Sequence, residues 1–247
     1  MAALPGVRSS WDKFYEYVRN NIQATEELLK QAQLGNNIKL FVNFSSSSVY
    51  GNWVDTAVNE TARTNPFSPY GVTKLAAETL CKSYYENFHI PLVNLRLFTV
   101  YGPGQRSDMG IHKFLKNAYI DKDPIVIFGD GEQRREFTYV NDVIDCCLKL
   151  INSEGIFESV VGNTFNIGGG VSVSVNDLMT GIQNMVGKKL KVENSDKMMG
   201  DVRNTIADID KAKKVLGWEP RVSLYEGLKA EWRWVKSIYN KTGELKK

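Results

Sequence analysis

Two short apolar runs, separated by a helical segment, constrain the fold of this chain most strongly. Residues 38–44 and 92–98 are apolar and short, as the buried strands of a parallel sheet are. The segment 70–88 between them follows the turn-rich sequence Asn65-Pro66-Phe67-Ser68-Pro69 and is expected to be helical. A strand, a helix and a second strand in this order predict a right-handed parallel crossover. We therefore expect an α/β fold.

Other segments extend this pattern into part of a doubly wound parallel sheet with a smaller C-terminal lobe. A third strand is expected at residues 164–167, followed by a helix that starts near Ser174 or Asn176. A helix is also expected at 11–33, because apolar residues recur there at helical spacing and Gly35 suits its end. The remaining expected elements are helices at 111–120, 141–151, 210–216 and 224–239 and a strand at 125–128.

The composition is that of a globular protein. At 247 residues and 43% hydrophobic, the chain can bury a substantial core, and its net charge of +3 is interspersed, which indicates neither a nucleic-acid nor a membrane surface. Three cysteines form no disulfide framework and suit a reducing compartment. The sequence has no apolar run of membrane-spanning length and no signal pattern, so we expect a soluble, cytoplasmic protein. His89 and His112 lack metal-ligand spacing, so no metal is expected.

Tyr70 and Lys74 carry the strongest chemical signal. Their i, i+4 spacing places both side chains on one face of the expected helix. An ammonium near a phenol favours the phenolate, which makes the tyrosine a better base. The serine run 45–48 follows the strand at 38–44 and can supply a hydroxyl to the same substrate group. A tyrosine, a lysine and a serine hydroxyl placed together suit the removal of a proton from an alcohol while its hydride is transferred to a nicotinamide. The alternative is an ordinary amphipathic surface turn, because such pairs occur by chance on many helices.

A glycine-rich dinucleotide turn is missing from the sequence. Neither Gly-x-Gly-x-x-Gly nor Gly-x-x-Gly-x-x-Gly occurs, although an enzyme of this type uses one to hold the pyrophosphate at a helix N-terminus. We therefore expect that the chain begins inside a domain. We also expect residues 1–247 alone to bind NAD weakly or not at all, to lack turnover and to tend to associate.

Several longer motifs show what the chain resembles. It is similar, from Ala2 to about Trp234, to the extended short-chain dehydrogenase/reductases of the nucleotide-sugar epimerase/dehydratase group. The resemblance rests on Gly6-Val7-Arg8, Leu95-Arg96-Leu97-Phe98-Thr99-Val100-Tyr101-Gly102-Pro103, Arg135-Glu136-Phe137-Thr138-Tyr139-Val140-Asn141-Asp142, Gly200-Asp201-Val202-Arg203 and Leu216-Gly217-Trp218-Glu219-Pro220.

The resemblance implies NAD as a tightly held cofactor and a UDP-sugar as substrate. It implies that residues 1–103, with the strand and helix at 163–186, are a remnant of the NAD-binding Rossmann domain. Residues 104–162 and 187–247 would then form the nucleotide-sugar-binding lobe. Relatives dimerise by packing two helices per subunit, which match the expected helices at 11–33 and 70–88, so a homodimer is expected.

The residues after the catalytic hydroxyl separate the chemistries of the family. That hydroxyl falls on Ser46, and Ser47 and Ser48 stand where a 4,6-dehydratase carries its acidic pair. Without an acid there, a 4-keto sugar can only be reduced again, from either face. The resemblance therefore implies NAD-dependent epimerisation of a UDP-hexose at C4. Two alternatives stay open: another extended dehydrogenase acting on a nucleotide sugar, such as a 4,6-dehydratase, and a non-catalytic truncated relative.

The resemblance also assigns site residues. Ser46, Tyr70 and Lys74 would be catalytic. The implied cofactor contacts are Asn20, Ser45, Ser46, Tyr70, Lys74 and Phe98. The implied substrate contacts are Ser47, Thr99, Lys113, Phe114, Val126, Phe128, Arg135, Asp201, Arg203 and Thr205.

Within the substrate set, Arg135 would grip the diphosphate, which suits a bidentate cation, and Asp201 would bind the ribose. The bland alternative for Arg135 is a solvated loop arginine. Met198 and Met199 depart from the family pattern, which often has basic residues there, and Arg203 is the candidate replacement. Thr205 stands where relatives with a tyrosine exclude N-acetylated sugars, so larger sugars are expected to fit.

Overall fold

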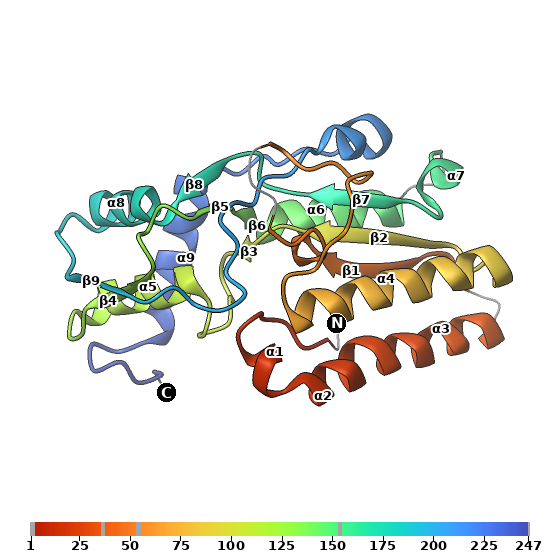
Figure 1. Ribbon diagram of the computed structural model, residues 1–247. Helices are drawn as coiled ribbons and strands as arrows, with labels where there is room; N and C mark the ends of the chain where they lie inside the picture. Colours follow the sequence, from red (N-terminus) through yellow and green to blue (C-terminus); the bar gives the residue numbers. More distant parts are fainter. Residues whose placement is uncertain (1–2, 36–37, 53–55, 153–154, 247) are drawn as a thin grey trace.

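The main sheet is parallel and consists of β1 (Phe41–Ser46), β2 (Leu92–Leu97) and β7 (Thr164–Ile167), in the order β1-β2-β7. The computed structural model describes residues 3–35, 38–52, 56–152 and 155–246, and Ala2, where the resemblance begins, lies outside them. The carboxyl ends of the three strands meet at one edge, where Ser46 is opposite Leu97 (Figure 1). This arrangement confirms the expected α/β class and parallel crossover.

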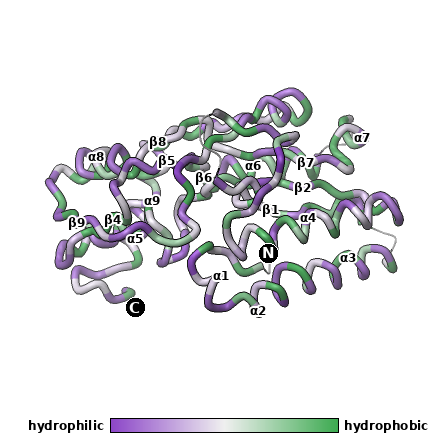
Figure 2. The backbone as a smooth tube through the Cα atoms, viewed as in Figure 1, coloured by the Kyte–Doolittle hydropathy of each residue, from purple (hydrophilic) through white to green (hydrophobic). Residues whose placement is uncertain are grey.

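Two long helical segments lie side by side along one face of this sheet (Figure 1). The first consists of α1 (Ser9–Asp12), α2 (Phe14–Tyr17), the π-helical η1 (Val18–Gln23) and α3 (Ala24–Gly35), and the second is α4 (Pro69–Phe88). The first segment was expected as one helix at 11–33, whereas the structure changes from α- to π-helical geometry within it. Hydrophobic and hydrophilic residues alternate along it, as an amphipathic helix requires (Figure 2). Its Leu29 packs with Cys81 of α4 and Leu92 of β2.

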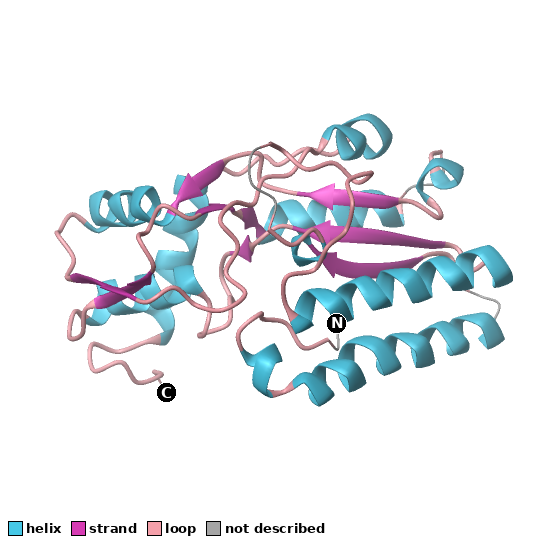
Figure 3. Cartoon of the chain, viewed as in Figure 1, coloured by secondary structure: helices cyan, strands magenta, loops and turns pink. Residues whose placement is uncertain are grey.

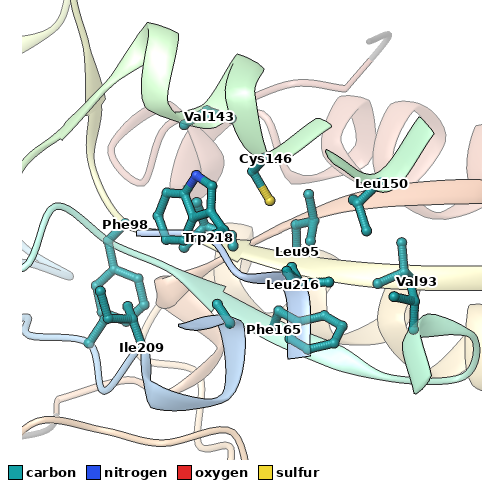
Figure 4. Packing of buried hydrophobic residues seen from close by; sticks show 14 of the residues in the cluster. Val93, Leu95, Phe98, Val143, Cys146, Leu150, Phe165, Ile209, Leu216 and Trp218 are labelled. Atoms are coloured by element: carbon teal, nitrogen blue, oxygen red, sulfur yellow. The ribbon is translucent and has the colours of Figure 1, made fainter. Parts of the chain in front are cut away.

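The other face of the sheet is covered by α6 (Val140–Ile151) and by η3 (Ala212–Leu216), which Trp218 follows. Figure 4 shows Trp218 between side chains of α6, such as Cys146, and those of the sheet, such as Leu95. The indole Nε1 of Trp218 donates a hydrogen bond to the Asp142 carbonyl oxygen at 2.8 Å. The C-terminal part of the chain therefore completes the core around the sheet.

A second group of elements packs around its own hydrophobic core. It contains α5 (Gly110–Ile120), α8 (Val175–Val186) and α9 (Leu224–Ile238), together with the strand pair β4 (Ile125–Phe128) and β9 (Val192–Ser195) (Figure 3). Ser174 caps α8 with a capping box, as the sequence predicted for one of two positions. The shorter elements are η2 (Ser47–Val49), α7 (Phe157–Val160), the pair β3 (Val100–Tyr101) and β6 (Thr138–Tyr139), and the pair β5 (Arg134–Glu136) and β8 (Ser172–Ser174).

The packing groups two helices differently from the expected domain boundaries. Leu178 and Ile182 of α8 are buried in the second core, although the helix was assigned with residues 163–186 to the sheet domain. Conversely, Val143 and Cys146 of α6 are buried in the first core, although their segment was assigned to the lobe. Both helices are amphipathic, and the sequence does not say which core an apolar face will meet. The division into two domains itself stays a prediction.

No helix in the described ranges combines the length and the apolar character needed to cross a bilayer.

Candidate active site

The serine run forms a tight turn at the carboxyl end of β1. Ser46 caps the short 3₁₀-helix η2, and its Oγ lies 3.2 Å from the backbone nitrogen of Ser48, from which it accepts a hydrogen bond. The same hydroxyl donates to Ser48 Oγ at 3.2 Å. Ser45 is buried, and its hydroxyl has no hydrogen-bond partner within the described part of the chain. Hydroxyl groups thus gather where α/β sheets bind ligands.

The start of α4 is held directly against this turn. Ser68 caps the helix by accepting a hydrogen bond from the backbone nitrogen of Gly71 at 3.2 Å, and Pro69 occupies the first helical position. A Cβ on Gly71 would lie 2.5 Å from the Ser48 carbonyl oxygen, so only glycine permits this approach. The close approach brings Tyr70, the next residue along the helix from Pro69, to the serine turn.

Tyr70 and Lys74 lie together on the first turns of α4, as their spacing predicted. The Lys74 Nζ is 6.0 Å from the Tyr70 ring centroid and donates a hydrogen bond to the Phe44 carbonyl oxygen at 2.8 Å. Burial lowers the pKa of Lys74 to about 8, against the opposing charge of Glu78. The lysine therefore loses its proton closer to neutral pH than an exposed lysine does.

The expected lowering of the Tyr70 pKa is not what the structure shows. Burial raises the pKa of Tyr70, and a hydrogen bond with the Ser46 side chain opposes the shift only in part. The physical reason is that desolvation disfavours the phenolate more strongly than its present neighbours favour it. In the chain by itself, Tyr70 is thus a neutral phenol at physiological pH.

A cavity of about 140 Å³ lies beside the serine turn. Arg135 and Asp201 line it as an ion pair, with Nη2 and Oδ1 2.7 Å apart. Thr205 also lines it and is fixed by a hydrogen bond from the backbone nitrogen of Glu136 to its Oγ1 at 3.2 Å. The expected substrate contacts that line this cavity are Ser47, Thr99, Arg135, Asp201 and Thr205.

A neighbouring cavity of about 230 Å³ shares Asp201 and Val202 with the first. Phe128 and Arg203, two of the implied substrate contacts, line it. Arg203 is not free, because its Nη1 donates to both carboxylate oxygens of Asp130 at 2.8 and 2.9 Å. The first cavity thus lies at the serine turn and the second at Phe128 of β4, with Asp201 and Val202 between them.

Several expected contacts lie elsewhere. The Asn20 side chain donates to the Glu16 carbonyl oxygen of its own helix at 2.8 Å. Phe98 is buried in the first core, 6.4 Å from the Tyr50 ring. Among the described residues, neither cavity is lined by Lys113, Phe114 or Val126: Lys113 is exposed, Phe114 packs on the second core, and Val126 is on the outer side of β4.

The buried asparagine beside the site is Asn21 and not the expected Asn20. Its Nδ2 donates to Thr73 Oγ1 of α4 at 3.1 Å and to the Leu4 carbonyl oxygen at 3.0 Å, and its Oδ1 accepts from the Leu4 nitrogen at 2.7 Å. It thereby ties the N-terminal segment to the helix that carries Tyr70. The available signal was its i, i+4 spacing from the buried Tyr17, which places it on the inner helix face.

Comparison with known proteins shows the family of this chain. The family described as GDP-mannose 4,6 dehydratase matches residues 1–230. The "Uncharacterized UDP-glucose epimerase YtcB" of Bacillus subtilis (strain 168) is 44% identical over 97% of this chain and 74% of its own length. The chain belongs to the extended short-chain dehydrogenase/reductase family of nucleotide-sugar epimerases and dehydratases.

Two further members of this family are close in sequence or structure. The UDP-glucuronate 4-epimerase of Thermodesulfobacterium geofontis is 39% identical over 96% of this chain and 71% of its own. The crystal structure of UDP-glucuronic acid 4-epimerase from Bacillus cereus in complex with UDP-glucuronic acid and NAD superimposes with a TM-score of 0.91 at 43% identity, over 97% of this chain and 74% of that one. The chain therefore spans about three quarters of the length of these relatives.

Proposed function

We propose that the protein is an NAD-dependent isomerase that epimerises a UDP-hexose at C4 through a 4-keto sugar. The observation that carries the proposal is that Ser46, Tyr70 and Lys74 lie together at the carboxyl end of β1, directly before Ser47 and Ser48, which line the cavity and are not acidic. A dehydratase needs an acidic pair at that place to move a proton and expel water, and the Ser47 and Ser48 side chains do not ionise at neutral pH. The relatives named as 4-epimerases support the same choice.

The carboxyl end of β1 fits the nicotinamide half of NAD. The Ser45 hydroxyl is buried without a partner within the described residues, and the Lys74 ammonium uses one bond for Phe44 and keeps further N–H groups for ribose oxygens. Bound NAD would supply the hydride acceptor for C4 and a positive nicotinamide charge. The expected loss of tight NAD binding in residues 1–247 alone remains a prediction.

The protein residues would then handle the proton of the C4 hydroxyl. Ser46 and Tyr70 lie close enough to bond each other, so one sugar hydroxyl can bond to both. Because burial raises the pKa of Tyr70, its phenol needs positive charge nearby before it acts as a base. Lys74 is a cation on the same helix face and supplies part of that charge.

The ion pair of Arg135 and Asp201 is the proposed site of the UDP diphosphate and ribose. A diphosphate would compete with Asp201 for the guanidinium fork of Arg135, and the freed carboxylate could accept from ribose hydroxyl groups. Thr205 leaves space next to the cavity, so we propose that a UDP-uronate or a UDP-N-acetylhexosamine fits as well as a UDP-hexose. A threonine in place of a tyrosine changes the discrimination between a small and a large sugar by only about 1–3 kcal/mol.

The experiment follows the C4 configuration of UDP-glucose, UDP-glucuronate and UDP-N-acetylglucosamine by proton NMR, with NAD added. Two proteins are assayed: the 247-residue chain, and the same chain preceded by a strand, glycine-rich turn and helix from a family member. We expect the extended protein to interconvert the C4 epimers and to leave C6 intact. Loss of the C6 hydroxyl, or no conversion of any of the three sugars by either protein, would contradict the proposal.

The Tyr70→Phe variant of the active form tests the proton-transfer role. We expect turnover to fall by about 10²–10⁴-fold, because a positioned proton-transfer group contributes this much. UDP-sugar affinity should be retained, because Arg135 and Asp201 are unchanged. Tyr84→Phe is the matched control, since Tyr84 is on the same helix and its hydroxyl pairs with Glu26 of α3. Unchanged turnover in Tyr70→Phe would remove Tyr70 from the mechanism.

We also propose a homodimer and a cytoplasmic location. The helices α1 to α4 carry exposed apolar side chains, among them Phe14, Tyr15, Leu28 and Phe88, which a second subunit could cover. Cys81, Cys146 and Cys147 are free thiols, which suits a reducing compartment.

A further inference from the structure

A buried ion pair lies one helical turn beyond Lys74. Glu78 of α4 and Arg96 of β2 are 6% exposed each, so both charges are removed from water. The Arg96 Nη2 is 2.8 Å from Glu78 Oε2, and its Nε is 3.0 Å from Oε1, which is the two-bond geometry that arginine and a carboxylate favour. A pair in this setting is costly to desolvate, and apolar residues could replace it at similar stability. Its presence calls for a role beyond stability.

The pair is anchored to the turn that carries the catalytic hydroxyl. The Arg96 Nη1 donates to the Tyr50 hydroxyl at 2.9 Å, and the guanidinium carbon lies 4.8 Å from the Tyr50 ring centroid. The Tyr50 hydroxyl donates in turn to Asn166 Oδ1 of β7 at 2.7 Å. The direction of the Arg96 side chain is therefore set by two elements other than α4.

Glu78 has two cations within reach of its position on α4. Lys74 precedes it by four residues and so lies on the same helix face, and Arg96 approaches from β2. The carboxylate pairs with Arg96, while the Lys74 Nζ bonds to the Phe44 carbonyl oxygen of β1. This division of partners leaves Lys74 beside Tyr70 instead of drawn along the helix toward Glu78.

We propose that Glu78 and Arg96 are a positioning pair for Lys74. Arg96 holds the Glu78 carboxylate away from the lysine, so that the ammonium bonds to Phe44 beside Tyr70. At the same time, the retained negative charge of Glu78 helps to keep Lys74 protonated in its buried place. Neither residue touches the reacting atoms; both act through Lys74. The inference rests on the proposed function in one respect, the catalytic role of Lys74.

The pKa of Lys74 should report whether Glu78 is charged and paired with Arg96, because Glu78 faces the lysine. Tyr70 and Glu78 face it from α4, the Phe44 carbonyl faces it from β1, and Arg96 reaches it from β2 through Glu78. Burial lowers the pKa of Lys74 to about 8, and Glu78 opposes that shift. Loss of the Glu78 charge must therefore lower the pKa further. Loss of Arg96 frees Glu78 to pair with Lys74 and must raise it.

The test is an NMR titration of the Lys74 ε-methylene signals in the 247-residue chain, without NAD or substrate. In Glu78→Gln, the titration midpoint of Lys74 should fall by on the order of one pH unit, because a unit negative charge one helical turn away is lost. In Arg96→Met, it should move in the opposite direction. Glu86→Gln is the matched control, because Glu86 is exposed on the same helix and pairs with Lys82, so it should leave the midpoint in place.

A Lys74 midpoint that is unchanged in Glu78→Gln, or that moves the same way in both variants, would overturn the inference. If Arg96→Met fails to fold because it leaves Glu78 buried and unpaired, the double variant Glu78→Gln/Arg96→Gln keeps a neutral hydrogen-bonded pair. Its midpoint should match that of Glu78→Gln. Absence of epimerase activity would count against the proposed function and leave this titration unaffected.

Discussion

At the scale of single residues, burial decides which titratable groups depart from their ordinary behaviour. Glu231 of α9 is fully buried, and burial raises its pKa to about 8, although its Oε2 accepts a hydrogen bond from the Gly102 nitrogen at 2.9 Å. Between about pH 4.5 and pH 8, the folded state therefore holds a proton that the unfolded state has lost. The contribution of Glu231 to stability is therefore largest below this window and falls as the pH rises through it, by up to about 1.4 kcal/mol per pH unit. In Glu231→Gln, the free energy of unfolding from urea titrations at pH 5, 6.5 and 8 should lose this slope. The exposed Glu193→Gln should keep it.

At the scale of elements, the contact between α4 and the serine turn depends on one glycine. Alanine is favoured over glycine by about 1 kcal/mol inside a helix. At Gly71, however, the added Cβ would lie 2.5 Å from the Ser48 carbonyl oxygen. We expect Gly71→Ala to destabilise the protein by about 1–3 kcal/mol, as overpacking does, and to displace Tyr70 from Ser46. Gly181 of α8 is the control, because nothing lies within 4 Å of a Cβ there, and Gly181→Ala should stabilise. A Gly71→Ala variant with a higher melting temperature would contradict this expectation, because the serine turn would then move to accommodate the Cβ at little cost.

At the scale of the whole molecule, the two helical segments along one sheet face predict the assembly. Leu28 of α3 is 55% exposed, whereas Leu29 beside it is buried against α4 and β2, so one helix presents apolar surface in two directions. A second copy packing on the outer direction would form a helical bundle. Light scattering at micromolar concentration should give a dimer, and Leu28→Glu should shift the mass to a monomer. Ile151→Glu changes an exposed apolar residue of α6 on the other sheet face and should leave the dimer intact. A monomer for the unaltered protein would contradict the assembly.

The sequence by itself determined the features that depend on neighbours along the chain. The apolar runs predicted β1, β2 and β7 to within a few residues, and the i, i+4 spacing placed Tyr70 and Lys74 on one face of α4. Helix caps such as Ser174 also follow from local hydrogen bonding. The family resemblance rested on motifs of the same local kind, and the comparisons confirmed it.

Only the tertiary structure decided the features that depend on groups far apart in the sequence. The inner asparagine is Asn21 and not Asn20, because Leu4 and Thr73 meet it from two other segments. The pKa of Tyr70 is raised and not lowered, because the packing around the phenol removes water. The pairing of Glu78 with Arg96 likewise needs β2 to lie against α4. Periodicity along a chain specifies which side of an element is apolar, whereas burial and charge pairing depend on which other elements meet that side.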